Sequence, residues 1–146
     1  MSARALRIAL IVLTSAGLGI AGYLTYVHYA GLTPVCGISH GCETVQTSRY
    51  ASLLHTPVAL LGLITYTFVF ATSFSRGERA MLSAFAMAVT AFAFSVYLTS
   101  RELFTIHAIC SWCVSSAIIF TLLAIITTMR LMTRHPAVAV LPNHAG

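Results

Sequence analysis

Residues 108–129 read AICSWCVSSAIIFTLLAIITTM, an uncharged run with Cys110 and Cys113 near its start. An α-helix rises about 1.5 Å per residue, so roughly 20 apolar residues cross the roughly 30 Å hydrocarbon core of a bilayer. This run reaches that length, and so do three uncharged runs that precede it, at residues 8–27, 56–75 and 80–100. The sequence therefore predicts an all-α integral membrane protein, a bundle of four transmembrane helices.

The composition excludes a soluble globular domain. Apolar residues make up 58% of the chain and charged residues only 8%, against about 45–50% and about 25% in soluble domains. The predicted helices use most of the 146 residues, which leaves room for one domain. We expect this domain over residues 1–135, with spans at about 6–29, 57–75, 80–100 and 107–131, and a short cytoplasmic tail over 136–146. A brief external link over residues 101–106 is expected to lead into the last span.

The charges of the chain indicate its orientation. All eight basic residues are Arg, and the formal net charge is +5. A nucleic-acid binder needs its basic residues clustered on one face, whereas these stand at the ends of the predicted helices, so we expect no nucleic-acid partner. Six lie on one predicted side of the membrane: Arg4, Arg7, Arg76, Arg79, Arg130 and Arg134. Only Arg49 and Arg101 lie on the other side, so the positive-inside rule places both termini in the cytoplasm.

The longest external segment, residues 30–55, is expected to cap the bundle. Its first half is broken by residues that disfavour regular structure: Gly31, Pro34, Gly37 and Gly41. Residues 43–54 then resume a helix-compatible pattern with one apolar face, formed by Val45, Tyr50, Leu53 and Leu54. We therefore expect a capping loop and a short interfacial helix over the mouth of the bundle.

All four cysteines lie on the predicted external side, where disulfides persist if the compartment is oxidising. Cys110-Ser-Trp-Cys113 opens the last helix, where the spacing places both sulfurs on one face and unbonded backbone N–H groups favour a thiolate. Cys36 and Cys42 stand on a glycine-containing loop that can move a sulfur between an external partner and the helix. Two such pairs can relay two electrons by thiol–disulfide exchange, and a lipid-soluble quinone is a fitting final acceptor.

Other functions of the same residues stay open. The two pairs can be structural disulfides, or the four ligands of a zinc ion, although the five residues between Cys36 and Cys42 exceed the usual spacing of about two to four. Covalent haem attachment through C-x-x-C-H is excluded because residue 114 is Val. A haem-binding protein and a small transporter are further alternatives. Proton-coupled transport is disfavoured because every Glu and Arg lies outside the four uncharged runs.

His107 is the histidine best placed to affect the cysteine chemistry, since it precedes Cys110 by three residues. We hypothesise that it favours the thiolate of Cys110. The remaining external histidines are expected to be interfacial polar residues: His28, His40 and His55.

In the order and spacing of several motifs, the chain resembles the bacterial vitamin K epoxide reductase family, in a single-domain form without a fused thioredoxin-like domain. The resemblance covers roughly residues 6–130. The matching elements are Cys36-x5-Cys42, Ser48 with Tyr50, the Pro57, Gly62 and Tyr66 pattern, and Cys110-Ser-Trp-Cys113. In the other quinone-linked disulfide-forming family the C-x-x-C motif comes first in the chain, whereas here it comes last.

The resemblance implies a four-helix bundle around a quinone, either ubiquinone or menaquinone. Cys113 then lies nearest to the quinone, and Cys110 exchanges with Cys42. Cys36 meets the thiol of the partner. The family pattern also implies a set of quinone-contacting residues: Ser48, Phe92, Ser95, Tyr97, Leu98 and Trp112.

The same resemblance implies a location and a partner. We expect a multi-pass protein of the bacterial inner membrane with its cysteines on the periplasmic side. The expected electron donor is a separate periplasmic thioredoxin-fold dithiol protein, because many bacterial relatives carry such a domain fused. The implied activity passes electrons from this donor to the quinone and so supports disulfide bond formation. The residues after Cys113, Val-Ser-Ser-Ala, lack the tyrosine of vertebrate members, which argues against epoxide reduction.

Overall fold

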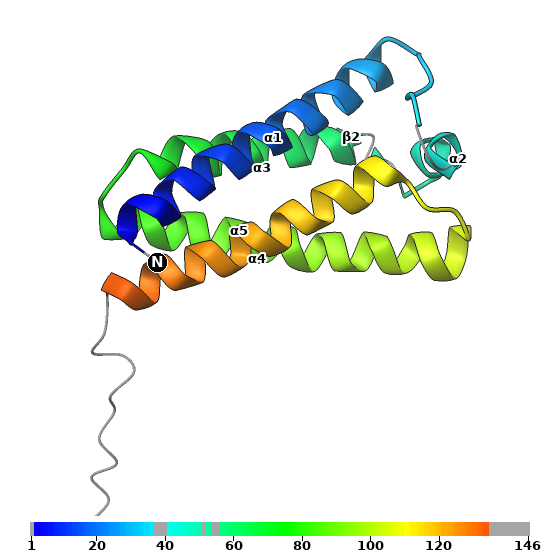
Figure 1. Cartoon of the computed structure of the whole chain (residues 1–146). Helices are drawn as coiled ribbons and strands as arrows, with labels where there is room; N and C mark the ends of the chain where they lie inside the picture. Colours follow the sequence, from blue (N-terminus) through cyan, green and yellow to red (C-terminus); the bar gives the residue numbers. More distant parts are fainter. Residues whose placement is uncertain (1, 37–40, 51, 54–55, 135–146) are drawn as a thin grey trace, which may run out of the picture.

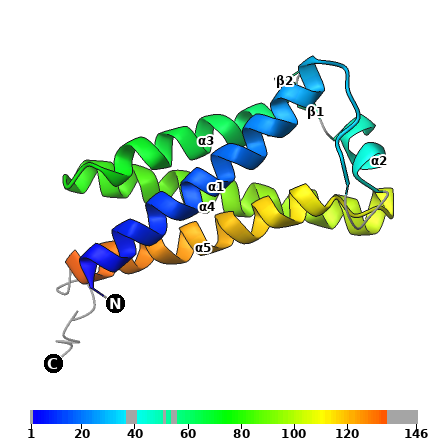
Figure 2. The ribbon, with the colours of Figure 1, turned by 45° about the horizontal axis from the view of Figure 1, so that its top comes forward.

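The computed structural model describes residues 2–36, 41–50, 52–53 and 56–134, and within them long helices lie side by side (Figures 1 and 2). The long helices are α1 (Ala3–Tyr29), α3 (Val58–Ser73), α4 (Glu78–Arg101) and α5 (Ser111–Arg134). The short elements are α2 (Gly41–Thr47), the strands β1 (Ser52–Leu53) and β2 (Thr56–Pro57), and the π-helix η1 (Glu102–Ile106). Helix α1 packs on α3 and α5, and α4 packs on the same two helices.

Three helical segments are long and apolar enough to cross a membrane: Ala3–Tyr29, Glu78–Thr105 and Ser111–Thr133. Helix α3 is apolar as well but has 16 residues, fewer than the roughly 20 that a perpendicular transmembrane helix needs. The mostly helical chain is therefore compatible with the predicted all-α membrane protein.

Local sequence explains where the helices begin. Ser2 caps α1 by accepting the Ala5 N–H on its hydroxyl oxygen at 3.2 Å. Pro57 stands directly before α3. The N–H groups at the start of a helix have no partner within the helix, so a proline costs no hydrogen bond there. Helix α5 begins directly after Cys110, whose carbonyl accepts the Val114 N–H at 3.0 Å. The C-x-x-C motif thus opens a helix, as the sequence predicts.

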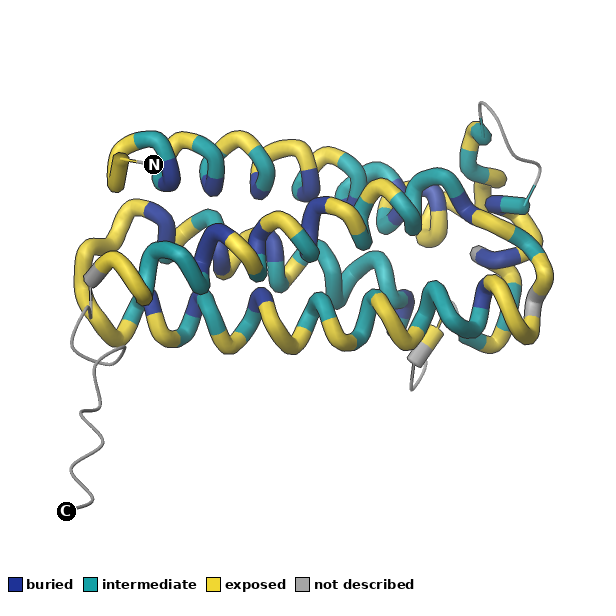
Figure 3. Tube along the Cα trace, turned by 60° about the horizontal axis from the view of Figure 1, so that its bottom comes forward, coloured by how far each residue is buried: buried dark blue, intermediate teal, exposed yellow. Residues whose placement is uncertain are grey.

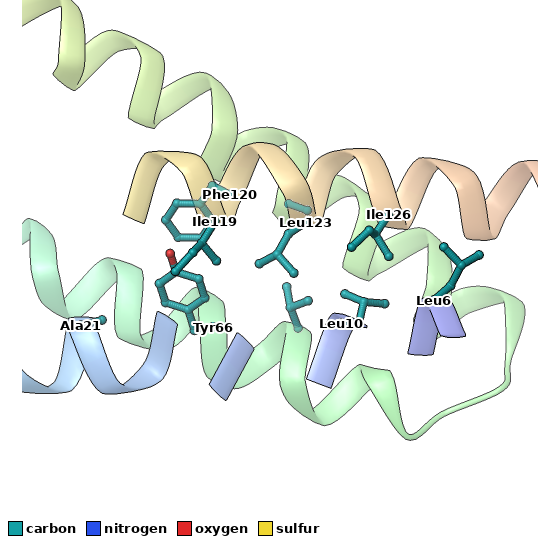
Figure 4. Close-up of a cluster of buried hydrophobic side chains, with 10 residues drawn as sticks. Leu6, Leu10, Ala21, Tyr66, Ile119, Phe120, Leu123 and Ile126 are labelled. Carbon is teal, nitrogen blue, oxygen red and sulfur yellow. The ribbon is translucent and has the colours of Figure 1, made fainter. Parts of the chain in front are cut away.

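The core lies between the facing sides of the helices (Figure 4). Tyr66 stacks on Phe120 with ring centroids 4.3 Å apart, and its hydroxyl is 2.8 Å from that of Ser116. The Tyr66 ring presses against the backbone of α1 at Gly17, where an added Cβ would collide with it. A glycine is required at this point because the Tyr66 ring of α3 packs directly on the backbone of α1.

The outer surface of the bundle is apolar. Along the helices at the outer edges of the view in Figure 3, buried positions lie on the side toward the rest of the bundle and exposed positions on the outer side. The exposed positions include many large apolar side chains, among them Ile8, Val12, Ile64, Ile118 and Ile125. An apolar exterior of this kind suits the hydrocarbon of a bilayer.

The predicted interfacial helix is shorter than the sequence indicates. Helix α2 ends at Thr47, so of the predicted apolar face it contains only Val45. Ser48 ends the helix, because both its N–H and its hydroxyl donate to the Val45 carbonyl, at 3.2 and 2.7 Å. Strand β1 then pairs with β2 in antiparallel register, Leu53 opposite Thr56. Leu54 lies outside the described residues.

The predicted link over residues 101–106 has helical form. Helix α4 continues to Arg101, and the chain then keeps helical form through η1. His107 ends it in the left-handed conformation, with φ 53°. Apolar periodicity cannot reveal this extension, because the turn is widened into a π-helix whose side chains follow a different period.

Candidate active site at the cysteine end of the bundle

The four cysteines gather at the end of the bundle that carries α2, opposite the N-terminus (Figures 1 and 2). Cys36 and Cys42 form a disulfide with their Cα atoms 6.2 Å apart, while Cys110 and Cys113 are thiols. Cys42 and Cys110 are completely buried in one cluster with Val45, and the other two cysteines pack against it. The fold therefore brings the two sequence-distant pairs into one site.

Gly41 allows α2 to approach the segment before Cys110. A Cβ added at Gly41 would lie 2.6 Å from the Ile109 carbonyl oxygen and 2.8 Å from its nitrogen. Any larger residue at position 41 would have to push these two segments apart. The close approach places Cys42, the next residue, beside Cys110 in the buried cluster.

Trp112 and Tyr23 hold the segment that leads to Cys36. The Trp112 indole Nε1–H donates to the Val35 carbonyl at 2.9 Å, and the Val35 N–H donates to the Tyr23 hydroxyl at 3.0 Å. The two rings also contact one another, with centroids 5.2 Å apart. These contacts anchor the residue before Cys36 to α1 and α5, and Cys36 itself stays partly exposed.

Glu102 is a buried carboxylate at the same site, and sequence reasoning missed it. Its side chain is only 4% exposed, and its Oε2 accepts the Cys110 N–H at 3.4 Å. It also hydrogen-bonds the Cys113 thiol. The carbonyl of Glu102 accepts the Ala108 N–H at 3.3 Å, so the same residue closes the end of η1.

An apolar cavity of about 340 Å³ opens beside the thiols. Its walls come from all the long helices and include Leu24, Leu61, Met87, Phe94 and Phe120. Its polar lining includes Ser48, Tyr50, Glu102 and Cys113. A thiol of the C-x-x-C motif thus faces a space that fits an apolar ring and tail.

The residues expected to contact a quinone are divided by the structure. Ser48, Ser95 and Leu98 line the cavity, whereas Phe92, Tyr97 and Trp112 are not among its lining residues. Tyr97 is 46% exposed and lies 5.1 Å from the Arg101 guanidinium. On α4, the rotation of the helix about its axis separates Ser95 and Leu98 from Phe92 and Tyr97, and apolar spacing alone does not specify that rotation.

Two histidines, His28 and His107, lie within the described residues. His28 and His107 are exposed, and His28 packs edge-on against Tyr29. His40 and His55 lie outside the described residues. In the described part of the chain, no three His, Cys, Asp or Glu side chains are grouped as they would be around a metal ion.

Comparison with known proteins agrees with this geometry. No curated protein matches the chain. A model of the vitamin K epoxide reductase family matches residues 8–128, a stretch that contains both cysteine pairs and Glu102. Proteins of this family act with quinones and generally use a redox partner. The chain therefore belongs to the vitamin K epoxide reductase family of membrane thiol–disulfide oxidoreductases.

Proposed function

We propose that the protein is a quinone-dependent thiol oxidase of the bacterial inner membrane. It takes two electrons from a separate periplasmic thioredoxin-fold dithiol protein and passes them through its two cysteine pairs to a quinone. The oxidised partner can then form disulfides in other proteins. One observation carries the proposal: both pairs meet in one cluster, and Cys113 also lines the apolar cavity.

The chain's residues fit a quinone in this cavity. Aliphatic and aromatic side chains form most of the lining, which suits an apolar ring and an isoprenoid tail and does not separate ubiquinone from menaquinone. When bound, a quinone accepts two electrons and two protons and becomes a quinol. Ser48, Ser95 and Leu98 would hold it against Cys113.

Exposure and burial of the cysteines support an order of exchange. Cys36 is partly exposed, so a partner thiolate attacks its sulfur and forms a mixed disulfide. The second thiol of the partner then breaks this mixed disulfide, which leaves the partner oxidised and the outer pair, Cys36 and Cys42, reduced. Cys42 next attacks Cys110 in the disulfide of the inner pair, Cys110 and Cys113, and releases the Cys113 thiol. Cys36 finally attacks Cys42, which restores the Cys36–Cys42 disulfide and releases the Cys110 thiol. The state with an outer disulfide and inner thiols, as in this structure, is the product of that exchange.

The distribution of arginines supports the proposed orientation. Arg4, Arg7, Arg76 and Arg130 line a second hollow at the end of the bundle opposite the cysteines. Positive charge of this kind is retained on the cytoplasmic side. We therefore propose that α1, α3, α4 and α5 all cross the membrane, with both termini in the cytoplasm and the cysteines in the periplasm.

A direct assay tests the function. Purified protein in detergent receives a reduced dithiol and a ubiquinone or menaquinone analogue, and quinone absorbance is followed. We expect reduction by the unmodified chain, none by Cys113→Ser, and an unchanged rate in Ser115→Ala, an exposed serine on the same helix whose hydroxyl donates to the Ser111 carbonyl. No reduction of either quinone by the unmodified chain would overturn the proposal.

A further inference from the structure

Glu102 is an acidic side chain in an apolar setting. It lies within the apolar helical segment Glu78–Thr105 and is 4% exposed. Burying a carboxylate is unfavourable unless it has hydrogen-bonding partners, and ionisable groups at such positions in membrane proteins usually serve function. The exchange of disulfides among the four cysteines makes no use of this residue, so its presence calls for a separate explanation.

The contacts of Glu102 connect the thiols to the cavity. Its Oε2 accepts the Cys110 N–H at 3.4 Å, and its carboxyl group hydrogen-bonds the Cys113 thiol. The Cys113 thiol in turn hydrogen-bonds Cys110. Glu102 and Cys113 both line the apolar cavity. One carboxyl group therefore touches a reacting thiol and borders the space where the electrons are delivered.

The other ionisable side chains near Glu102 have different surroundings. The Arg101 guanidinium lies over the rings of Tyr97 and Tyr50, 5.1 and 5.8 Å from their centroids. Tyr50 itself lines the cavity. At the end of η1 His107 is exposed, and on α2 so is Glu43. Glu102 is thus the carboxylate in direct contact with the inner thiols.

We propose that Glu102 is a catalytic proton carrier, which accepts the proton of the Cys113 thiol and delivers it into the cavity. This inference rests on the proposed function. When the Cys110–Cys113 bond forms, the two thiols lose two electrons and two protons, and a quinone needs both to become a quinol. Glu102 would pass the Cys113 proton to a quinone bound in the cavity. The two thiols lose two protons and the quinol gains two, so the remaining thiol proton and the second quinol proton balance by exchange with bulk water.

The variants that test this role change the carboxyl group without removing the local hydrogen bond. Glu102→Gln keeps an oxygen that accepts the Cys110 N–H but cannot carry a proton, and Glu102→Asp retains the carboxylate. Positioned acid–base groups typically contribute about 100-fold or more to a rate. We expect single-turnover quinone reduction to slow by about 100-fold in Glu102→Gln, with partial recovery in Glu102→Asp. Glu43→Gln, on an exposed acid of α2, is the matched control and should keep the rate of the unmodified chain.

A second measurement needs no quinone. Infrared difference spectra, recorded as the inner pair of the quinone-free protein is oxidised and reduced, should show a carboxylic-acid C=O band change. The band change should vanish in Glu102→Gln and persist in Glu43→Gln. Absence of any such band in the unmodified protein would overturn the inference even if Glu102→Gln failed to fold.

The two proposals fail in distinguishable ways. If the unmodified chain reduces quinone and Glu102→Gln does so equally fast, the carrier role is wrong and the oxidase stands. If the unmodified chain reduces no quinone, the oxidase is wrong, whereas the infrared result still reports on proton transfer between Cys113 and Glu102.

Discussion

Gly17 shows how a single missing side chain determines the packing of two helices. The Tyr66 ring occupies the place that a Cβ at position 17 would take, and the ring also stacks on Phe120. The Tyr66 hydroxyl is in turn fixed by Ser116, a residue that lines the cavity. The wall of the cavity therefore depends on a glycine of another helix.

Gly17→Ala should destabilise the fold. Overpacking of a close-packed interior typically costs about 1–3 kcal/mol, so the thermal unfolding midpoint in detergent should fall. Gly19→Ala is the matched control on the same helix, because nothing lies within 4 Å of an added Cβ there. Equal unfolding midpoints for the two variants would contradict the packing argument.

Single residues also show the limits of sequence reasoning at this site. The spacing and predicted location of the four cysteines indicate a site made of two pairs, and the structure brings both pairs into one cluster. Glu102 was missed, since a glutamate next to an arginine at a helix end has the pattern of an exposed interfacial residue. Its burial follows from the π-turn and from the Cys110 N–H, and neither has a signal in apolar periodicity.

At the scale of elements, the docking of α2 on the segment before α5 decides whether the pairs can exchange. Gly41 is the point of closest approach, against the Ile109 backbone. The sequence predicts a capping helix here but overestimates its length, because Ser48 and Thr47 satisfy carbonyl groups of α2 with their own side chains. Serine and threonine side chains at such positions bond to backbone groups that a continued helix would use. The residues that follow are apolar, so the sequence pattern does not reveal that the helix ends here.

Gly41→Ala should weaken the approach of Cys42 to Cys110. In a chain that carries Cys36→Ala and Cys113→Ala, only these two cysteines remain, so an oxidant can join them only to each other within the molecule. We expect rapid formation of this bond, and a lower fraction bonded once Gly41→Ala is added, measured by the thiols left for alkylation. Gly77→Ala, where an added Cβ meets nothing within 4 Å, should have no effect. Equal fractions of the Cys42–Cys110 bond in the two glycine variants would contradict the role of Gly41 in bringing these cysteines together.

At the scale of the whole molecule, each of the four uncharged runs overlaps one long helix, because a stretch of about 20 apolar residues without charges is typical of a membrane-spanning helix. Their ends are less predictable, since caps and turns are set by local hydrogen bonds. The second apolar run illustrates this. Its first residues form β2, which pairs with β1 and leaves α3 with 16 residues. The relative rotation of the helices, which selects Ser95 and Leu98 over Phe92 and Tyr97 for the cavity, depends on packing that no single run encodes.

The proposed orientation predicts which ends of the helices water-soluble reagents can reach. In a cysteine-free background, single cysteines are introduced as Arg76→Cys and Arg134→Cys or restored at position 36. A membrane-impermeant maleimide added to intact spheroplasts should label position 36, because the cysteine end faces outward. The two arginine positions should be labelled only after lysis. Labelling of position 134 in intact spheroplasts would reverse the proposed topology.

The complete burial of Cys42 and Cys110 also has a consequence for selectivity between redox pools. In the proposed relay, the two sulfurs that exchange with one another are therefore closed to water and to soluble thiols, whereas Cys36 and Cys113 stay partly exposed. A soluble thiol can then enter at Cys36, and Cys113 can meet an acceptor in the cavity, but neither can react with the two buried sulfurs. A relay built in this way would keep its donor and its acceptor apart while joining them through a sealed pair of sulfurs.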